Sequence, residues 1–276
     1  MLPNLSAITL LGHSGVGKTT LSTMLAKDGW FHYSGDFRIA TRYLNEAIDN
    51  WLLEQTQALP IFSDLISKNA ISIKGKVSIE QLAVISAYIG KIGRQGMSYD
   101  IFLQRQKAFM QAEKCAMYDI EQFMPLAQKR YGMTSFNNDA GGSLGEYLDD
   151  AALMNFLAKR TLIVYLDAGE ELQAELERRA VQYPKPICYD TSFLQQMIET
   201  YAQESAIAHP DDFDSDDFLR FVGPKLLRHR RHRYSEIAKR YGISLPVEKV
   251  WACKDAGEFA YLLTETYHKQ RGTSCH

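Results

Sequence analysis

The residue pattern with the clearest chemistry is GHSGVGKT at residues 12–19, which matches the phosphate-binding loop (P-loop) motif G-x-x-x-x-G-K-[ST]. Glycines in such a loop let successive backbone N–H groups point at phosphate oxygens. In this motif Lys18 reaches the β- and γ-phosphates and the Thr19 hydroxyl ligates Mg²⁺. We expect the His13 side chain to point to solvent. The sequence therefore predicts a site for ATP and Mg²⁺ formed by Gly12, His13, Ser14, Gly15, Val16, Gly17, Lys18, Thr19 and Thr20.

Asp36 is the next candidate, because it follows the second predicted strand and so belongs at the same edge of the sheet as the P-loop. A carboxylate at that place can orient or deprotonate an attacking hydroxyl group. Arg38 and Arg42 share a helix face if a helix begins promptly after Asp36, and together they would hold an anionic substrate. The alternative is that Asp36 caps a helix N-terminus and that both arginines are solvated.

The segment NNDAGGS, residues 137–143, carries a third group of candidates. Asp139 ends a predicted strand, and a carboxylate there would hold Mg²⁺ through water. Gly141 and Gly142 lack side chains, so a substrate could approach their backbone closely. The alternative interpretation of this segment is a plain tight turn.

Basic residues that follow the fourth predicted strand predict a mobile cover, or lid, over the site. Arginines on such a cover can neutralise a phosphoryl group during transfer and exclude water. A nucleic-acid patch is the alternative, although the acidic segment DDFDSDD at residues 211–217 can pair with the basic helix. A solvated helix face is the third interpretation. The residues concerned are Arg178, Arg179, Arg228, Arg230, Arg231 and Arg233.

Alternating strands and helices predict an α/β fold, a doubly wound parallel sheet of five strands with helical insertions. The strands are expected near residues 6–11, 30–35, 133–138, 161–167 and 247–252, with a hairpin around residues 74–76. A long helix is expected over residues 99–131 and another after Pro224. We divide the chain into a first core part (1–44), a helical insertion on the acceptor side (45–130) and a second core part (131–276) with its lid at about 178–233.

Composition narrows the class of protein. Of 276 residues, 46% are hydrophobic and 23% charged, with a formal net charge of −2, which does not favour nucleic acid or an anionic membrane as partner. Four cysteines without a CxxC pair predict a reduced protein, and no apolar run is long enough for a membrane span. The first residues lack the basic start of a signal peptide. We therefore expect a cytoplasmic protein.

In the order of its motifs the chain resembles the small-molecule P-loop kinases, the shikimate kinase and nucleotide kinase group. The pieces are GHSGVGKTT, YSGDFRIATRY, NDAGGS, YLDAGEELQAELERRAVQYPKPICY, and RHRYSEIAKRYGISL followed by VWACKDAGEFAYLL. The resemblance implies that Asp36 contacts the acceptor hydroxyl and that Gly141 and Gly142 line the acceptor pocket. It also implies that Arg178 or Arg179 touches the nucleotide and that Arg233 grips the acceptor anion.

This chain departs from that family between residues 45 and 130 and again between residues 187 and 224, where it is longer. The sequence therefore predicts transfer of the γ-phosphoryl group of ATP to a small anionic acceptor, with Lys18, Asp36 and Arg179 as catalytic residues. Two alternatives stay open. One is an NTPase or nucleotide switch acting through the insertion, and the other is a nucleotide-binding module that engages a protein or RNA.

Overall fold

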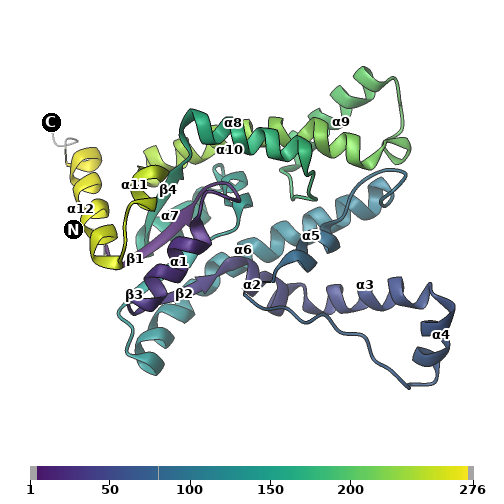
Figure 1. The fold of residues 1–276 in the computed structure, drawn as a ribbon, viewed down its shortest axis with the longest axis horizontal. Helices are drawn as coiled ribbons and strands as arrows, with labels where there is room; N and C mark the ends of the chain where they lie inside the picture. Colours follow the sequence, from purple (N-terminus) through teal and green to yellow (C-terminus); the bar gives the residue numbers. More distant parts are fainter. Residues whose placement is uncertain (1–4, 80, 273–276) are drawn as a thin grey trace.

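The computed structural model describes residues 5–79 and 81–272, which form an α/β fold around one parallel sheet (Figure 1). Its strands are β1 (Ala7–Leu11), β2 (Trp30–Ser34), β3 (Ser135–Asp139), β4 (Leu162–Asp167) and β5 (Gly242–Pro246). Their order across the sheet is β2-β3-β1-β4-β5, and every pair is parallel. The predicted α/β class and five-stranded parallel sheet are confirmed.

The sheet is covered on both faces because its central strands alternate their buried side chains between two apolar cores. On β1, Ile8 and Leu10 belong to one core with Leu21 and Leu25 of α1 (Lys18–Lys27). Ala7 and Leu11 belong to the opposite core, which includes side chains of α6, α7 and α10. This arrangement leaves the carboxyl ends of the strands as the edge where polar groups can gather.

The remaining helices follow in chain order around the sheet. The first group is α2 (Gly35–Arg38), a π-helical turn η1 (Ile39–Tyr43), α3 (Asn45–Gln57), α4 (Pro60–Ser67), α5 (Ala83–Ile89) and α6 (Tyr99–Tyr131). The second group is a 3₁₀ turn η2 (Gly142–Tyr147), α7 (Ala151–Arg160), α8 (Gly169–Gln182), α9 (Thr191–Ser205), η3 (Pro210–Asp212), α10 (Ser215–Tyr241), α11 (Val247–Trp251) and α12 (Ala256–Arg271). The helix predicted over residues 99–131 is confirmed as α6.

The region predicted as an insertion is fastened to the sheet by α6. Tyr33 on β2 donates its hydroxyl to the Ala116 carbonyl at 2.6 Å, and its ring contacts Phe123. Phe109 and Met117 of α6 belong to the same core as Phe136 of β3. In contrast, α3 and α4 extend to one side of the sheet (Figure 1). A third core joins the start of α6 to α9 and to the first half of α10.

Two predicted strand regions are wrong. Residues 247–251 form helix α11, because Val247 and Val250 are the buried pair and their spacing of three is helical. The fifth strand lies just before, where Ile243 and Leu245 point to one core. Residues 71–77 form no strand, so the hairpin around residues 74–76 is absent. There the Gly75 N–H bonds the Asp49 carboxylate at 2.7 Å.

Helix α10 also begins earlier than expected. It starts at Ser215, capped by the Asp214 carboxylate, and continues through Pro224 to Tyr241. Among the residues that the structure describes, no helix is both long and apolar enough to cross a membrane.

Candidate functional site

A cavity of about 290 Å³ lies at the carboxyl edge of the sheet, beside the P-loop. It brings together Lys18, Thr19, Asp36 and Asp139, which the sequence predicted as one site. The cavity follows from topology, because β1, β2 and β3 are neighbours and each ends at this edge. Its other lining residues are Ser14, Gly15, Gly17, Thr20, Ser34, Ile79, Leu82, Ala140 and Gly142.

The P-loop has the backbone form that its glycines permit. Gly12, Gly15 and Gly17 have φ values of 151°, 91° and 94°, a region that other residues rarely adopt. The Lys18 ammonium donates to the carbonyls of Gly12 at 2.8 Å and His13 at 3.1 Å. Burial lowers the pKa of Lys18, and the carboxylates of Asp139 and Asp36 oppose that shift. The loop can therefore receive a phosphate group with Lys18 already held beside it.

Three of the predicted loop residues, Gly12, His13 and Val16, do not line this cavity. The Val16 side chain belongs to the apolar core, and its carbonyl accepts the Trp251 indole N–H at 3.1 Å. His13 is 2% exposed, so the expectation that it points to solvent is wrong. Its ring stands edge-on to Tyr234, and burial followed by the charge of Arg230 lowers its pKa to about 3. His13 is therefore a neutral packing residue.

Thr19 and Asp139, the predicted metal residues, are in contact. The Thr19 hydroxyl donates to Asp139 Oδ2 at 3.2 Å, and His32 Nε2 lies 3.4 Å from the same oxygen. Within the described ranges, no three His, Cys, Asp or Glu side chains are grouped to hold a metal ion. The hydroxyl and carboxylate fit Mg²⁺, which takes few protein ligands and completes its shell with phosphate oxygens and water.

Asp36 does not cap a helix, because Ser34 has that place in α2 and accepts the Phe37 N–H at 3.2 Å. The Asp36 side chain is thereby left free to line the cavity. Burial and, secondarily, the neighbouring Asp139 raise its pKa to about 6, although the charge of Lys18 acts in the opposite direction. At neutral pH such a carboxylate is ionised and still basic enough to take a proton.

Three predicted substrate arginines lie away from this cavity. Arg38 bonds Asp119 of α6 at 2.7 Å and lies over the Phe123 ring. Arg233 donates to the Gly145 carbonyl at 2.8 Å and to Asp149 at 2.9 Å. Arg42 is exposed on η1. None of the three lines the cavity, so the structure does not assemble the anion clamp that the sequence suggested.

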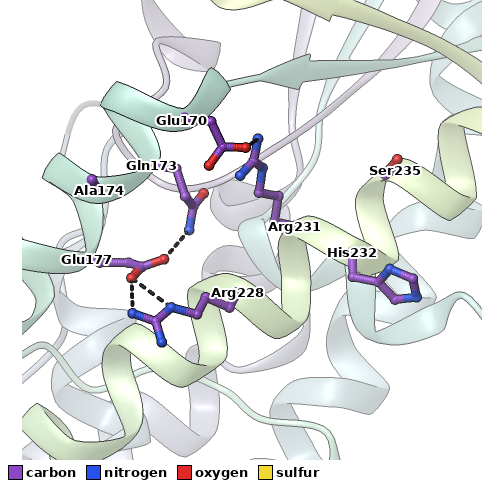
Figure 2. Close-up of a pocket in the computed structure, with 8 residues that line it drawn as sticks. All are labelled: Glu170, Gln173, Ala174, Glu177, Arg228, Arg231, His232 and Ser235. Atoms are coloured by element: carbon purple, nitrogen blue, oxygen red, sulfur yellow. Dashed lines mark hydrogen bonds and ion pairs between the residues drawn. The ribbon is translucent and has the colours of Figure 1, made fainter.

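Two of the predicted lid arginines, Arg228 and Arg231 of α10, pair with acidic residues of α8 (Figure 2). Arg228 contacts Glu177 at 2.6 Å and Arg231 contacts Glu170 at 2.9 Å, across a groove of about 530 Å³. Arg178 and Arg179 both pair with Glu175. The acidic segment at residues 211–217 bonds elsewhere, for example Asp216 with Lys91. Glu177 and Glu170 of α8 therefore neutralise Arg228 and Arg231 of α10.

Arg179 nevertheless remains close to the P-loop. It lines a second cavity of about 450 Å³ that begins at Ser14 and Gly15 and continues between α8 and α10. Most of its other lining residues are apolar, among them Leu176, Ile187 and Leu227.

Arg230, three residues before Arg233, lies beside Gly142 at the wall of the P-loop cavity, although it is not among the residues that line the cavity. A Cβ added to Gly142 would stand 3.8 Å from Arg230 Nη1 and 3.7 Å from the backbone nitrogen of Ser14 in the P-loop. Arg230 therefore lies close to the P-loop. Glu146 holds its Nε at 2.7 Å, and the Cys188 carbonyl holds its Nη2 at 2.7 Å. The sequence singled out Arg230 only as part of the basic run, because nothing in that run distinguishes it from Arg233.

Glu113 of α6 is the other site residue that sequence analysis missed. Its side chain is 0% exposed and accepts the Ser143 hydroxyl at 2.8 Å. A signal was present, because Glu113 interrupts an otherwise largely apolar stripe that includes Phe109, Ala116 and Ile120 at helical spacing. Acidic residues are rarely fully buried unless they are paired, so Glu113 on the buried face of α6 is a candidate functional residue.

Comparison with known proteins adds no relative: no protein-family model matches this chain, and the search of curated proteins gives no significant match. The functional argument therefore depends on the cavity and on the residues around it.

Proposed function

We propose that this chain is an ATP-dependent phosphotransferase that acts on a small molecule. The observation that carries the proposal is the single cavity that joins Lys18 and Thr19 of the P-loop to Asp36. A phosphate-binding loop and a candidate base at one site are the two halves that phosphoryl transfer to a hydroxyl group requires.

On the donor side, the loop residues 12–19 would hold the phosphates of ATP, with Thr19 and Asp139 as the groups for Mg²⁺. Bound Mg²⁺ would supply positive charge to the phosphate oxygens. Lys18 and Arg230 add positive charge from the protein. Arg230 is fixed by Glu146 and the Cys188 carbonyl, so it needs no rearrangement to act. Arg179, on the wall of the neighbouring cavity, is the residue that can follow the nucleotide if the lid closes.

On the acceptor side, Asp36 would orient a hydroxyl group and accept its proton as the oxygen bonds to phosphorus and ADP leaves. Its raised pKa, about 6, suits this role because the carboxylate is charged at neutral pH yet retains basicity. Ile79 and Leu82, from the region before α5, close the cavity above the loop and would limit the access of water.

Paired variants test this proposal. Lys18→Ala should abolish binding of labelled ATP in equilibrium dialysis. Asp36→Asn should bind ATP within about twofold of the wild type but lose at least about a hundredfold of label transfer to small molecules from a cell extract. Full transfer by Asp36→Asn would contradict the assignment of the acceptor side.

A nucleotide switch is the second candidate, and α4 favours it. Leu59, Ile61 and Phe62 expose 52%, 70% and 37% of their surfaces on the extended α3–α4 arm, which is unusual for large apolar residues. A switch would release phosphate from ATP at the same rate with and without the small-molecule extract. Under this candidate, Ile61→Ser would leave that rate unchanged and would weaken binding of a protein partner.

A further inference from the structure

A second acidic residue, Glu113, lies beside Asp36 behind the wall of the cavity and is not among the residues that line it. Glu113 reaches this place from the middle of α6, and one of its oxygens, Oε2, is buried without a hydrogen-bond partner. An unpartnered buried oxygen costs free energy that a bound donor would recover.

Gly141 is what lets the two carboxyl groups come together. The Cβ of any other residue at this position would stand 2.7 Å from Glu113 Oε1 and 2.8 Å from Asp36 Oδ1. Glu113 Oε1 and Asp36 Oδ1 therefore both lie within 3 Å of one point at Gly141, whose neighbours Ala140 and Gly142 line the cavity. The Ser143 hydroxyl donates to the same oxygen, Glu113 Oε1, at 2.8 Å, and the oxygen without a partner is Oε2.

The positive groups nearby are already committed to other partners. Lys18 is bonded to two P-loop carbonyls, and Arg230 is bonded to Glu146 and to the Cys188 carbonyl. Arg38 and Arg233 are held by Asp119 and Asp149, outside the cavity. An anionic acceptor would therefore meet the Asp36 carboxylate, and the two cations near this place, Lys18 and Arg230, are the ones assigned to the phosphates of ATP.

We propose that the acceptor is an uncharged or cationic molecule rich in hydrogen-bond donors, a polyol or amino alcohol, which Asp36 and Glu113 hold between them. This inference rests on the proposed phosphotransferase function and replaces the anionic acceptor expected from Arg38, Arg42 and Arg233. Asp36 binds the reacting hydroxyl, and Glu113 binds a neighbouring hydroxyl or ammonium group. The insertion therefore selects the substrate by contributing an acid to the acceptor site.

A charge-fractionated extract tests the proposal without knowledge of the molecule. Small molecules from a cell extract are separated into anion-exchange-retained, cation-exchange-retained and unretained fractions, and each is incubated with the full chain and γ-labelled ATP. The fastest label transfer is expected with the unretained or cation-exchange-retained fraction. Fastest transfer with the anion-exchange-retained fraction would overturn the proposal but leave phosphotransferase function intact. Transfer with no fraction would overturn both.

Glu113→Gln then tests the residue itself. Glutamine keeps the shape and the bond from Ser143 but cannot ionise, so at pH 9, above the raised pKa of Glu113 of about 8, the KM for the active fraction should rise about tenfold while the KM for ATP stays unchanged. Between pH 7 and 9 the acceptor KM of the wild type should fall, whereas that of the variant should not. Glu204→Gln, exposed on α9, is the matched control. Equal acceptor KM values and equal pH profiles in Glu113→Gln and the wild type would overturn the role of Glu113.

Discussion

Arg230 of α10 and Glu146 of η2 form an ion pair at 2.7 Å that is closed off from solvent, with side-chain exposures of 6% and 0%. The pair joins the lid helix to the turn that follows the glycine pair. His229 and Arg233 approach the same carboxylate at 3.6 Å and 3.9 Å. Glu146 therefore organises three basic residues of α10, and it sets which of them faces the P-loop.

Glu146→Gln should destabilise the protein strongly, because it leaves a buried guanidinium without its counter-charge. Breaking one side of a buried pair costs about 3–5 kcal/mol. Urea unfolding followed by circular dichroism measures this change, with Glu171→Gln on the exposed face of α8 as the control. A loss no larger than that of the control would mean that the pair does not hold α10 in place.

Lowering the pH should weaken the ion pair between Glu146 and Arg230. The pKa of Glu146 is lowered chiefly by the charge of Arg230, against the opposing effect of burial, so the carboxylate contributes stability above its ordinary pKa of 4.5. That contribution is lost as the pH falls below 4.5 through the lower folded-state pKa. Unfolding midpoints measured from pH 6 to pH 3 should fall in the wild type and stay flatter in Glu146→Gln.

The P-loop, Asp36 and Asp139 could be predicted as one site because each is tied to the end of a strand. The P-loop follows β1, Asp36 follows β2 and Asp139 ends β3, so a parallel sheet brings them together whatever the intervening chain does. The positions of the arginines of α10 depend on contacts between distant segments. Arg230 bonds the Glu146 carboxylate and the Cys188 carbonyl, whereas Arg233, three residues later, bonds the Gly145 carbonyl and Asp149.

The fifth strand was predicted near residues 247–252 but lies at Gly242–Pro246, and this error also comes from a contact between distant segments. The segments GISLP and VEKVW are both short and partly apolar. Over five residues, the spacing of the apolar side chains does not separate a strand from a helix. The contacts of Gly242 decide the matter, because a Cβ there would stand 2.0 Å from the Ile163 carbonyl. That close approach to β4 is a tertiary contact, which no local sequence pattern predicts.

Glu113 gives the opposite dependence of stability on pH. Burial raises its pKa to about 8, so between its ordinary value of 4.5 and pH 8 the unfolded chain is ionised while the folded protein keeps the proton. Stability should therefore fall by about 1.4 kcal/mol per pH unit across this window from this group. Glu113→Gln should remove that slope. Parallel stability curves of variant and wild type between pH 5 and 8 would show that Glu113 is ionised in the folded state.

Trp251 should report on occupancy of the P-loop. Its indole N–H bonds the Val16 carbonyl at 3.1 Å, and its Nε1 stands 2.8 Å from the position of a Cβ on Gly17. Addition of MgADP should change tryptophan emission in the wild type, and Trp251→Phe should lose most of that change while binding is still detected by dialysis. An unchanged signal in Trp251→Phe would assign the response to Trp30 or Trp51 instead.

The two glycines that the sequence grouped together should behave differently. An alanine Cβ at position 141 would stand within 3 Å of both Glu113 and Asp36, whereas at position 142 the nearest atom is 3.7 Å away. Gly141→Ala should therefore cost about 1–3 kcal/mol of stability through overpacking, and Gly142→Ala should be close to neutral. Gly141 has φ −58°, so backbone strain does not contribute to the difference. Chemical denaturation of both variants measures it, and acceptor-dependent label transfer should be lost only in Gly141→Ala. Equal effects at the two positions would argue that the carboxyl groups of Asp36 and Glu113 are not held over Gly141 in solution.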